Sequence, residues 1–198
     1  SYAYYTDPKH NLPVFIDPSN PNKYLYCGNT DWIDETTKDN ALMQQYTLSV
    51  NGKSNATSYY GSVGFMDQEG TLKHYDDRYK RFNMNLNITT DVRKWLQLQL
   101  KTTYNHTYRN APFGANNDEE EKAMDAAFYG ADHRPFMPVY HPDGNFSGQG
   151  SWTNMVATQS ISGSRKQKQN DLWLTGGMKI TPLEGLVLNV DYTFNMYS

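Results

Sequence analysis

The amino-acid sequence predicts an all-β protein: an antiparallel up-and-down transmembrane β-barrel segment of about six strands with long extracellular loops. Three observations lead to this fold class. Apolar and polar residues alternate strictly in several runs, short and long connections alternate between those runs, and aromatic residues gather near one end of them. Strict alternation places every other side chain on one face of a strand. Alternating short turns and long loops are the layout of an outer-membrane barrel.

The alternation is clearest in three runs, in which the intervening residues are mainly amides with few charges. The apolar members of these runs are Phe82, Met84, Leu86 and Ile88, then Leu96, Leu98 and Leu100, and finally Leu186, Leu188 and Val190. An amide-rich opposite face is expected of a wall that separates lipid from water. We therefore expect these apolar rows to face the lipid bilayer.

Composition agrees with a barrel and excludes some other classes. Only 37% of the 198 residues are hydrophobic, whereas 14% are aromatic and 16 are Tyr. Low hydropathy is compatible with a barrel, because only alternate strand residues face lipid. The net charge of −3 and the lack of a basic stripe predict no nucleic-acid partner. The single Cys27 cannot form an internal disulfide.

The N-terminal part of the chain differs from the rest. Residues 1–45 are rich in turn-forming pairs such as Asp7-Pro8 and Asp17-Pro18, so they are predicted to be an extracellular loop region without regular elements that leads into the barrel. Residues 46–108 are predicted to hold four barrel strands, at 46–50, 57–66, 79–89 and 95–108.

The remainder is predicted to contain a loop and a hairpin. Residues 109–168 form a long extracellular loop with a short helix near 118–129, and residues 169–198 form a barrel hairpin. The basic cluster of Arg165, Lys166 and Lys168 is interpreted as part of a solvated loop. On this layout the turns near Lys53, Asp91 and Pro182 are periplasmic.

Aromatic residues of the apolar rows gather at the predicted outer rim, at positions Tyr46, Phe65, Phe82, Tyr104, Tyr108, Tyr192 and Phe194. Amphipathic rings prefer the level of the lipid headgroups, which explains such sorting. Closure of a barrel needs about eight strands or more, and lipid cannot satisfy the backbone groups of an open edge. The six predicted strands are therefore expected to be one arc of a larger barrel.

No catalytic or metal site is predicted. The adjacent acidic residues Glu119, Glu120 and Glu121 suggest a glycosidase, but neighbours on a helix do not face each other, so they are better interpreted as a solvated helix start. Asp132, His133 and His141 lack the spacing of two His one helical turn apart. We expect no enzyme activity and no cofactor.

The long loop is rich in aromatic residues, of which we take four as candidates for contact with substrate: Tyr129, Tyr140, Phe146 and Trp152. Rings with nearby amides and carboxylates suit stacking on sugar faces or binding of a partner. The alternative is that these rings pack the loop onto itself or onto neighbouring loops. The sequence leaves both interpretations open.

Several segments, in order along residues 29 to 144, resemble the SusC/RagA-type TonB-dependent outer-membrane transporters of Bacteroidetes. They are Asn29-Thr30-Asp31-Trp32-Ile33-Asp34-Glu35, Tyr46-Thr47-Leu48-Ser49-Val50-Asn51-Gly52 with Thr57-Ser58-Tyr59-Tyr60, Asp67-Gln68-Glu69-Gly70, Tyr79-Lys80-Arg81-Phe82-Asn83, Lys94-Trp95-Leu96, and Pro138-Val139-Tyr140-His141-Pro142-Asp143-Gly144. The resemblance implies a barrel of roughly 22 strands with a plugged lumen. It also implies a SusD-like surface lipoprotein and a TonB complex as partners, and import of oligosaccharides or peptides. The TonB box and the plug of the family are absent from this sequence.

Two rival functions remain as alternatives. The first is a soluble or surface-displayed β-sandwich that acts as a carbohydrate-binding module, which predicts that a second apolar layer packs on the first. The second is a glycoside hydrolase, which needs two carboxylates that meet across a cleft. Candidates such as Glu69, Asp143 and Asp191 lie on unrelated loops and strands.

Overall fold

The structure is a computed structural model that describes residues 14–113, 134–141, 143–148 and 154–198. The chain forms two compact units. One unit, which we call the sheet unit, comprises residues 41–70, 77–111 and 165–198. The other, which we call the loop unit, is assembled from residues 1–40, 71–76 and 112–164.

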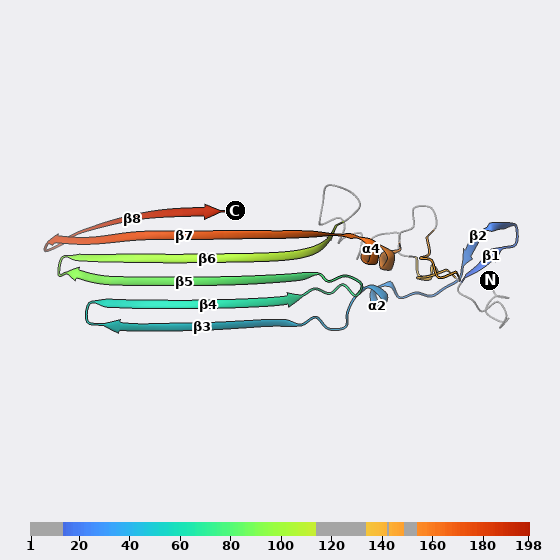
Figure 1. Ribbon diagram of the computed structural model, residues 1–198, viewed down its shortest axis with the longest axis horizontal. Helices are drawn as coiled ribbons and strands as arrows, with labels where there is room; N and C mark the ends of the chain where they lie inside the picture. Colours follow the sequence, from blue (N-terminus) through green and yellow to red (C-terminus); the bar gives the residue numbers. More distant parts are fainter. Residues whose placement is uncertain (1–13, 114–133, 142, 149–153) are drawn as a thin grey trace. The chain divides into compact units, whose positions relative to one another are not determined.

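The sheet unit contains a six-stranded sheet whose strands lie side by side in chain order (Figure 1). The strands are β3 (Met43–Ser54), β4 (Thr57–Glu69), β5 (Arg78–Arg93), β6 (Leu96–Phe113), β7 (Gly163–Leu183) and β8 (Leu186–Tyr197). This up-and-down order confirms the predicted fold class. The sheet is not closed, and β3 and β8 form its edges, as expected of a piece of a larger barrel.

The three short turns of the sheet, which connect β3 to β4, β5 to β6 and β7 to β8, lie at the same end in Figure 1. Two of them use a residue that tolerates positive φ, as tight hairpins require. Asn55 has φ 27° and Gly185 has φ 82°. Both turns are shorter than the sequence predicted, because strand pairing continues to Ser54 and Thr57 in one hairpin and to Leu183 and Leu186 in the other.

The prediction of no regular elements before the barrel was wrong. Residues 14–26 form an antiparallel hairpin of β1 (Val14–Asp17) and β2 (Asn20–Tyr26), followed by the short helix α2 (Trp32–Thr36). The turn-forming pair Asp17-Pro18 makes the tip of this hairpin, where the backbone N–H of Ser19 donates to the Asp17 carboxylate at 2.8 Å. Turn chemistry here connects two strands and does not mark an extended loop.

A second short helix, α4 (Met155–Ile161), was not predicted. β7 begins at Gly163, so Arg165, Lys166 and Lys168 lie in a strand and not in the solvated loop that the sequence suggested. The helix predicted near 118–129 lies outside the described residues. Among the helices that the structure describes, none is long and apolar enough to cross a membrane.

Candidate functional site

One face of the sheet is a continuous apolar surface, because the strand register brings the apolar rows of neighbouring strands together. Val63 of β4 lies opposite Leu48 of β3 and opposite Met84 of β5. Leu188 of β8 lies opposite Ile180 of β7. Leu48 is 72% exposed and Leu188 is 48% exposed. These large apolar side chains have no second protein layer over them in the described part of the chain, which is the arrangement of a lipid-facing wall.

An aromatic row crosses the apolar face near the end of the sheet that is opposite the short turns. Phe65 pairs with both Tyr46 and Phe82, so three rings from three strands stand in one line. The ring of Tyr104 on β6 lies 6.3 Å from that of Phe82. The register therefore places Tyr46, Phe65 and Phe82 at one level, as the sequence predicted and as in the girdles of barrel proteins. The prediction was wrong for Tyr192, which lies in the middle of the sheet beside Ile88 and Leu100.

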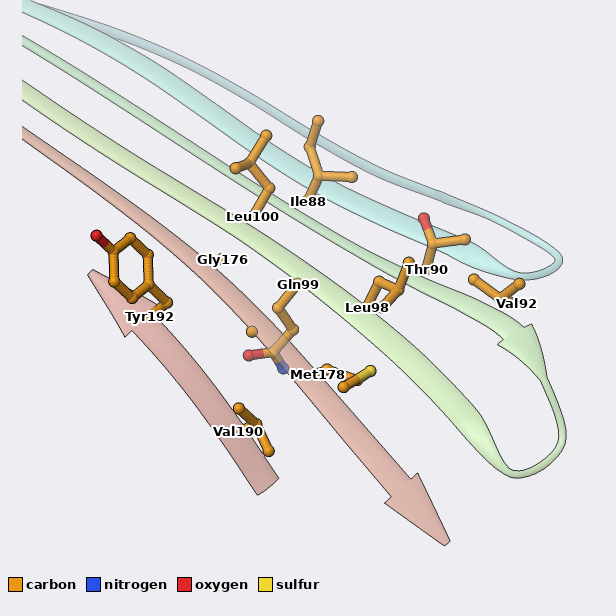
Figure 2. A pocket seen from close by; sticks show the side chains of 11 residues that line it. Ile88, Thr90, Val92, Leu98, Gln99, Leu100, Gly176, Met178, Val190 and Tyr192 are labelled. Atoms are coloured by element: carbon orange, nitrogen blue, oxygen red, sulfur yellow. The ribbon is translucent and has the colours of Figure 1, made fainter. Parts of the chain in front are cut away.

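The apolar face carries a groove over Gly176, where β7 has no side chain (Figure 2). Its volume is about 570 Å³, and side chains from four strands line it: Ile88, Thr90, Leu98, Leu100, Met178, Val190 and Tyr192. Nothing lies within 4 Å of the point where a Gly176 side chain would begin. The apolar face is thus grooved in the middle of the sheet and lined there almost entirely by carbon atoms.

The opposite face is polar and carries hydrogen bonds between strands. Asn85 of β5 donates its side-chain amide to the Ser62 hydroxyl of β4 at 3.3 Å, and the Thr103 hydroxyl of β6 donates to the Asn85 oxygen at 3.2 Å. The hydroxyls of Thr175 and Thr193 are 2.9 Å apart across β7 and β8. Such a face suits contact with water, as in the lumen of a barrel.

The loop unit has its own hydrophobic core, formed by Trp32, Met137, Met155 and Val156. Trp32 opens helix α2, and its indole Nε1–H donates to the carbonyl oxygen of Arg134 at 3.0 Å. The preceding Asp31 caps the helix by accepting hydrogen bonds from the backbone N–H groups of Ile33 and Asp34. The Asp-Trp pair of the sequence motif at residues 29–35 thus has a structural role, because one residue starts the helix and the next fills the core.

Gln159 of α4 connects three separate segments of the loop unit. Its side chain is buried, with 4% exposed. The side-chain Nε2 donates to the carbonyl oxygen of Thr36 at 3.1 Å, and Oε1 accepts from the backbone N–H of His74 at 3.2 Å. A buried amide that satisfies groups on two other segments contributes to holding them together.

An aromatic cluster of the loop unit surrounds His141. Its imidazole ring lies 4.4 Å from the ring of Tyr24 and 5.8 Å from that of Tyr26. The Tyr26 hydroxyl donates to the carbonyl oxygen of Gly148 at 3.0 Å and lies 2.9 Å from His141 Nε2. The Tyr26 hydroxyl thus connects His141 to the backbone at Gly148. Burial raises the pKa of Tyr26 above its usual value.

Two of the four candidate substrate residues are described, and the structure brings them together. Tyr140 and Phe146 form an isolated antiparallel bridge, with ring centroids 5.2 Å apart. Tyr140 is 50% exposed, whereas Phe146 packs against the core of the loop unit. Asp143 stabilises the turn between them by accepting from the Asn145 backbone and side chain, which lowers the pKa of Asp143. Tyr129 and Trp152 lie outside the described residues.

Sequence reasoning missed Tyr24 and Tyr26, and it considered His141 only as a metal ligand. The spacing of the two Tyr residues by two was the available signal, because it places both rings on one face of a strand. The structure gives His141 a tyrosine partner. Within the described ranges, no three His, Cys, Asp or Glu side chains gather as metal ligands would.

Comparisons with known proteins agree with this geometry. No protein-family model matches the chain. TonB-dependent receptor P26 of Formosa agariphila is 27% identical over 162 residues, which cover 78% of this chain and 14% of that protein. Two structures of the RagAB peptide importer, in the closed-closed and open-open states, match with TM-scores of 0.60 and 0.57, at 18% and 19% identity. Each match covers 91% of this chain and 21% of the solved chain.

The chain thus spans about a seventh of the curated relative and a fifth of the solved chains that it matches. Three kinds of observation are consistent with a segment of an outer-membrane barrel. They are the ordered motifs of residues 29–144, the sheet with one apolar face, and the two comparisons. The sheet has the fold of a segment of an outer-membrane β-barrel, and the chain is similar to a TonB-dependent receptor and to the RagAB peptide importer.

Proposed function

We propose that this chain forms part of the wall and of the outer loops of an importer that takes up nutrient oligomers, either oligosaccharides or peptides. Its partners would be a SusD-like surface lipoprotein and, through other parts of the protein, the TonB complex. The observation that carries the proposal is the sheet with one apolar face and one hydrogen-bonded polar face. A sheet with these two faces separates hydrocarbon from water and so encloses an aqueous path.

The folded loop unit supports a role in contact with substrate. Its half-exposed Tyr140 is held by a bridge to Phe146, which is itself packed on the core. A ring fixed in this way offers a flat surface at little cost in conformational entropy. We therefore propose Tyr140 as a contact for the incoming oligomer, with Phe146 as the residue that positions it. Tyr129 and Trp152 remain further candidates for this contact.

Uptake by cells that produce the full-length transporter would test the proposal. Fluorescent oligopeptides and oligosaccharides are offered separately, with and without TonB. We expect TonB-dependent uptake of one class. Tyr140→Ala should weaken that uptake by about fivefold in apparent affinity, because a stacked ring contributes roughly 1 kcal/mol.

Tyr192→Ala is the matched control, because Tyr192 is 75% exposed but lies on the apolar face of the sheet. It should leave uptake unchanged. Uptake that continues without TonB would contradict the proposed importer. Equal effects of the two substitutions would contradict only the role of Tyr140.

No feature of the described residues favours the carbohydrate-binding sandwich. That fold needs a second sheet packed on the apolar face, and Leu48 and Leu188 remain exposed there. The relatives are named as a receptor and an importer, so we assign transport and no chemical reaction to this chain.

A further inference from the structure

A band of charged residues lies on the apolar face of the sheet, beyond the aromatic row. The register continues past the row of Tyr46, Phe65 and Phe82 to the pair of Asp67 and Lys80, and then to the pair of Glu69 and Arg78. Alternation along β4 and β5 keeps these four side chains on the face that carries Phe65 and Phe82. The charges therefore begin one row outside the aromatic girdle, on the side directed to lipid.

The same band continues onto β7. Asn170 of β7 lies beside the aromatic row, since its side-chain oxygen accepts from the Tyr104 hydroxyl at 3.0 Å. Lys168 and Lys166 follow at alternate positions of the same strand and are exposed. They consequently share the face of Asn170 and extend away from the aromatic row. We call Asp67, Glu69, Arg78, Lys80, Lys166 and Lys168 the charged band.

The charges of this band do not cancel. Arg78 lies 3.1 Å from both Asp67 and Glu69, and Lys80 lies 3.5 Å from Asp67. Both carboxylates are thus engaged with cations of β5. Within the described part of the chain, Lys166 and Lys168 have no ion-pair partner. The band therefore carries a net charge of +2, with its excess on β7.

We propose that the charged band binds the phosphate of an anionic lipid headgroup in the outer leaflet, and that Lys166 and Lys168 are its main contacts. The assignment rests on the proposed lipid-facing orientation of this face. A headgroup lies at the level just beyond an aromatic girdle, where this band begins. Lysine ammonium groups bind phosphate as strongly hydrated point charges. The band is complementary in sign to such a headgroup, and the apolar rows below it are complementary to the acyl chains.

The inference can be tested with the full-length transporter in detergent micelles, titrated with lipid A and followed by native mass spectrometry. The double variant Lys166→Gln with Lys168→Gln should bind lipid A at least about tenfold more weakly, because it removes the two cations of the band that have no carboxylate partner among the described residues. Dephosphorylated lipid A should bind weakly to the unaltered protein. Inorganic phosphate at millimolar concentration should not displace lipid A, because it lacks the acyl chains.

The matched control is the double variant Lys101→Gln with Lys179→Gln. These two lysines are also exposed strand residues, but they alternate with Leu100 and Met178 and so lie on the polar face. Equal loss of lipid A binding in both double variants would overturn the proposal, as would equal binding of dephosphorylated lipid A. Migration of the unheated protein on a denaturing gel verifies that each barrel is folded. Uptake of nutrient by the β7 variant separates this result from the proposed function, because import should continue.

Discussion

The depth of each residue in the bilayer can be worked out from the register, and it predicts a graded effect of arginine substitutions. In a tilted barrel strand each residue advances about 2.5 Å toward the opposite interface. Leu100 pairs with Ile88, six residues along β5 from Phe82 in the aromatic row. Leu100 therefore lies about 15 Å below that row, close to the middle of an apolar band about 25 Å tall.

Leu100→Arg should destabilise the barrel by roughly 2–4 kcal/mol, the cost of a charge at the bilayer midplane. Leu98 pairs with Thr90, two residues further, and so lies about 20 Å below the aromatic row. Leu98→Arg should cost only about 1 kcal/mol, because the arginine is closer to the far interface. Gln99→Arg, on the polar face between them, should be close to neutral.

The assay is guanidinium unfolding of the full-length protein in lipid bilayers, with the folded fraction read from gel migration without heating. Extrapolation to zero denaturant gives the free energy of unfolding for each variant. The assigned faces of the sheet are refuted if Gln99→Arg lowers the free energy of unfolding as much as Leu100→Arg does. It is also refuted if Leu98→Arg costs more than Leu100→Arg, because the calculated depths would then be wrong.

Three further predictions concern the loop unit. Trp32→Phe removes the hydrogen bond from the indole to Arg134 and should lower the free energy of opening of the loop unit by about 1–3 kcal/mol. Faster hydrogen exchange at the Thr30 amide would measure this loss. Unchanged exchange at Thr30 would contradict the prediction. Gln159→Ala should expose the His74 amide to exchange at a cost of about 1–3 kcal/mol, whereas Thr36 keeps the hydrogen bond from Lys73. Equal protection of His74 in both proteins would show that Gln159 is dispensable. The pKa of Tyr26 is higher in the folded protein than the value of 10.0 expected in the unfolded chain. The contribution of Tyr26 to stability is therefore complete below pH 10.0 and is lost as the pH rises through the pKa of the folded state. Limited proteolysis from neutral to strongly alkaline pH should show this loss in the unaltered protein and not in Tyr26→Phe.

The sheet was predictable from the sequence because its signal is local and repeated. Alternation identifies the face of the sheet on which each side chain lies. One face carries Phe82, Met84, Leu86 and Ile88, as expected. The strands proved longer than predicted at their outer ends. The segment from Gly163 to Lys168 is polar and charged, so hydrophobic alternation gave no reason to extend β7 there.

The loop unit was largely missed, because its elements are short and its contacts are distant in sequence. Helix α2 has five residues and α4 has seven, too few for a reliable helical period. Asp31 followed by acidic residues in the first turn was the one local signal of α2. The contact between Gln159 and Thr36 joins residues that are 123 positions apart, which no local pattern reveals.

The assembly of the loop unit from three separated segments constrains how the proposed importer can acquire a new specificity. Met137 and Met155 are buried against Trp32, which belongs to a distant part of the chain. Replacing one segment alone with that of another transporter would leave apolar surface and hydrogen-bonding groups without their counterparts. Chimeras that retain the fold should therefore exchange residues 14–40, 71–76 and 134–164 as one set. Recombination confined to a single segment is expected to produce proteins whose barrels assemble but whose outer surface is poorly ordered.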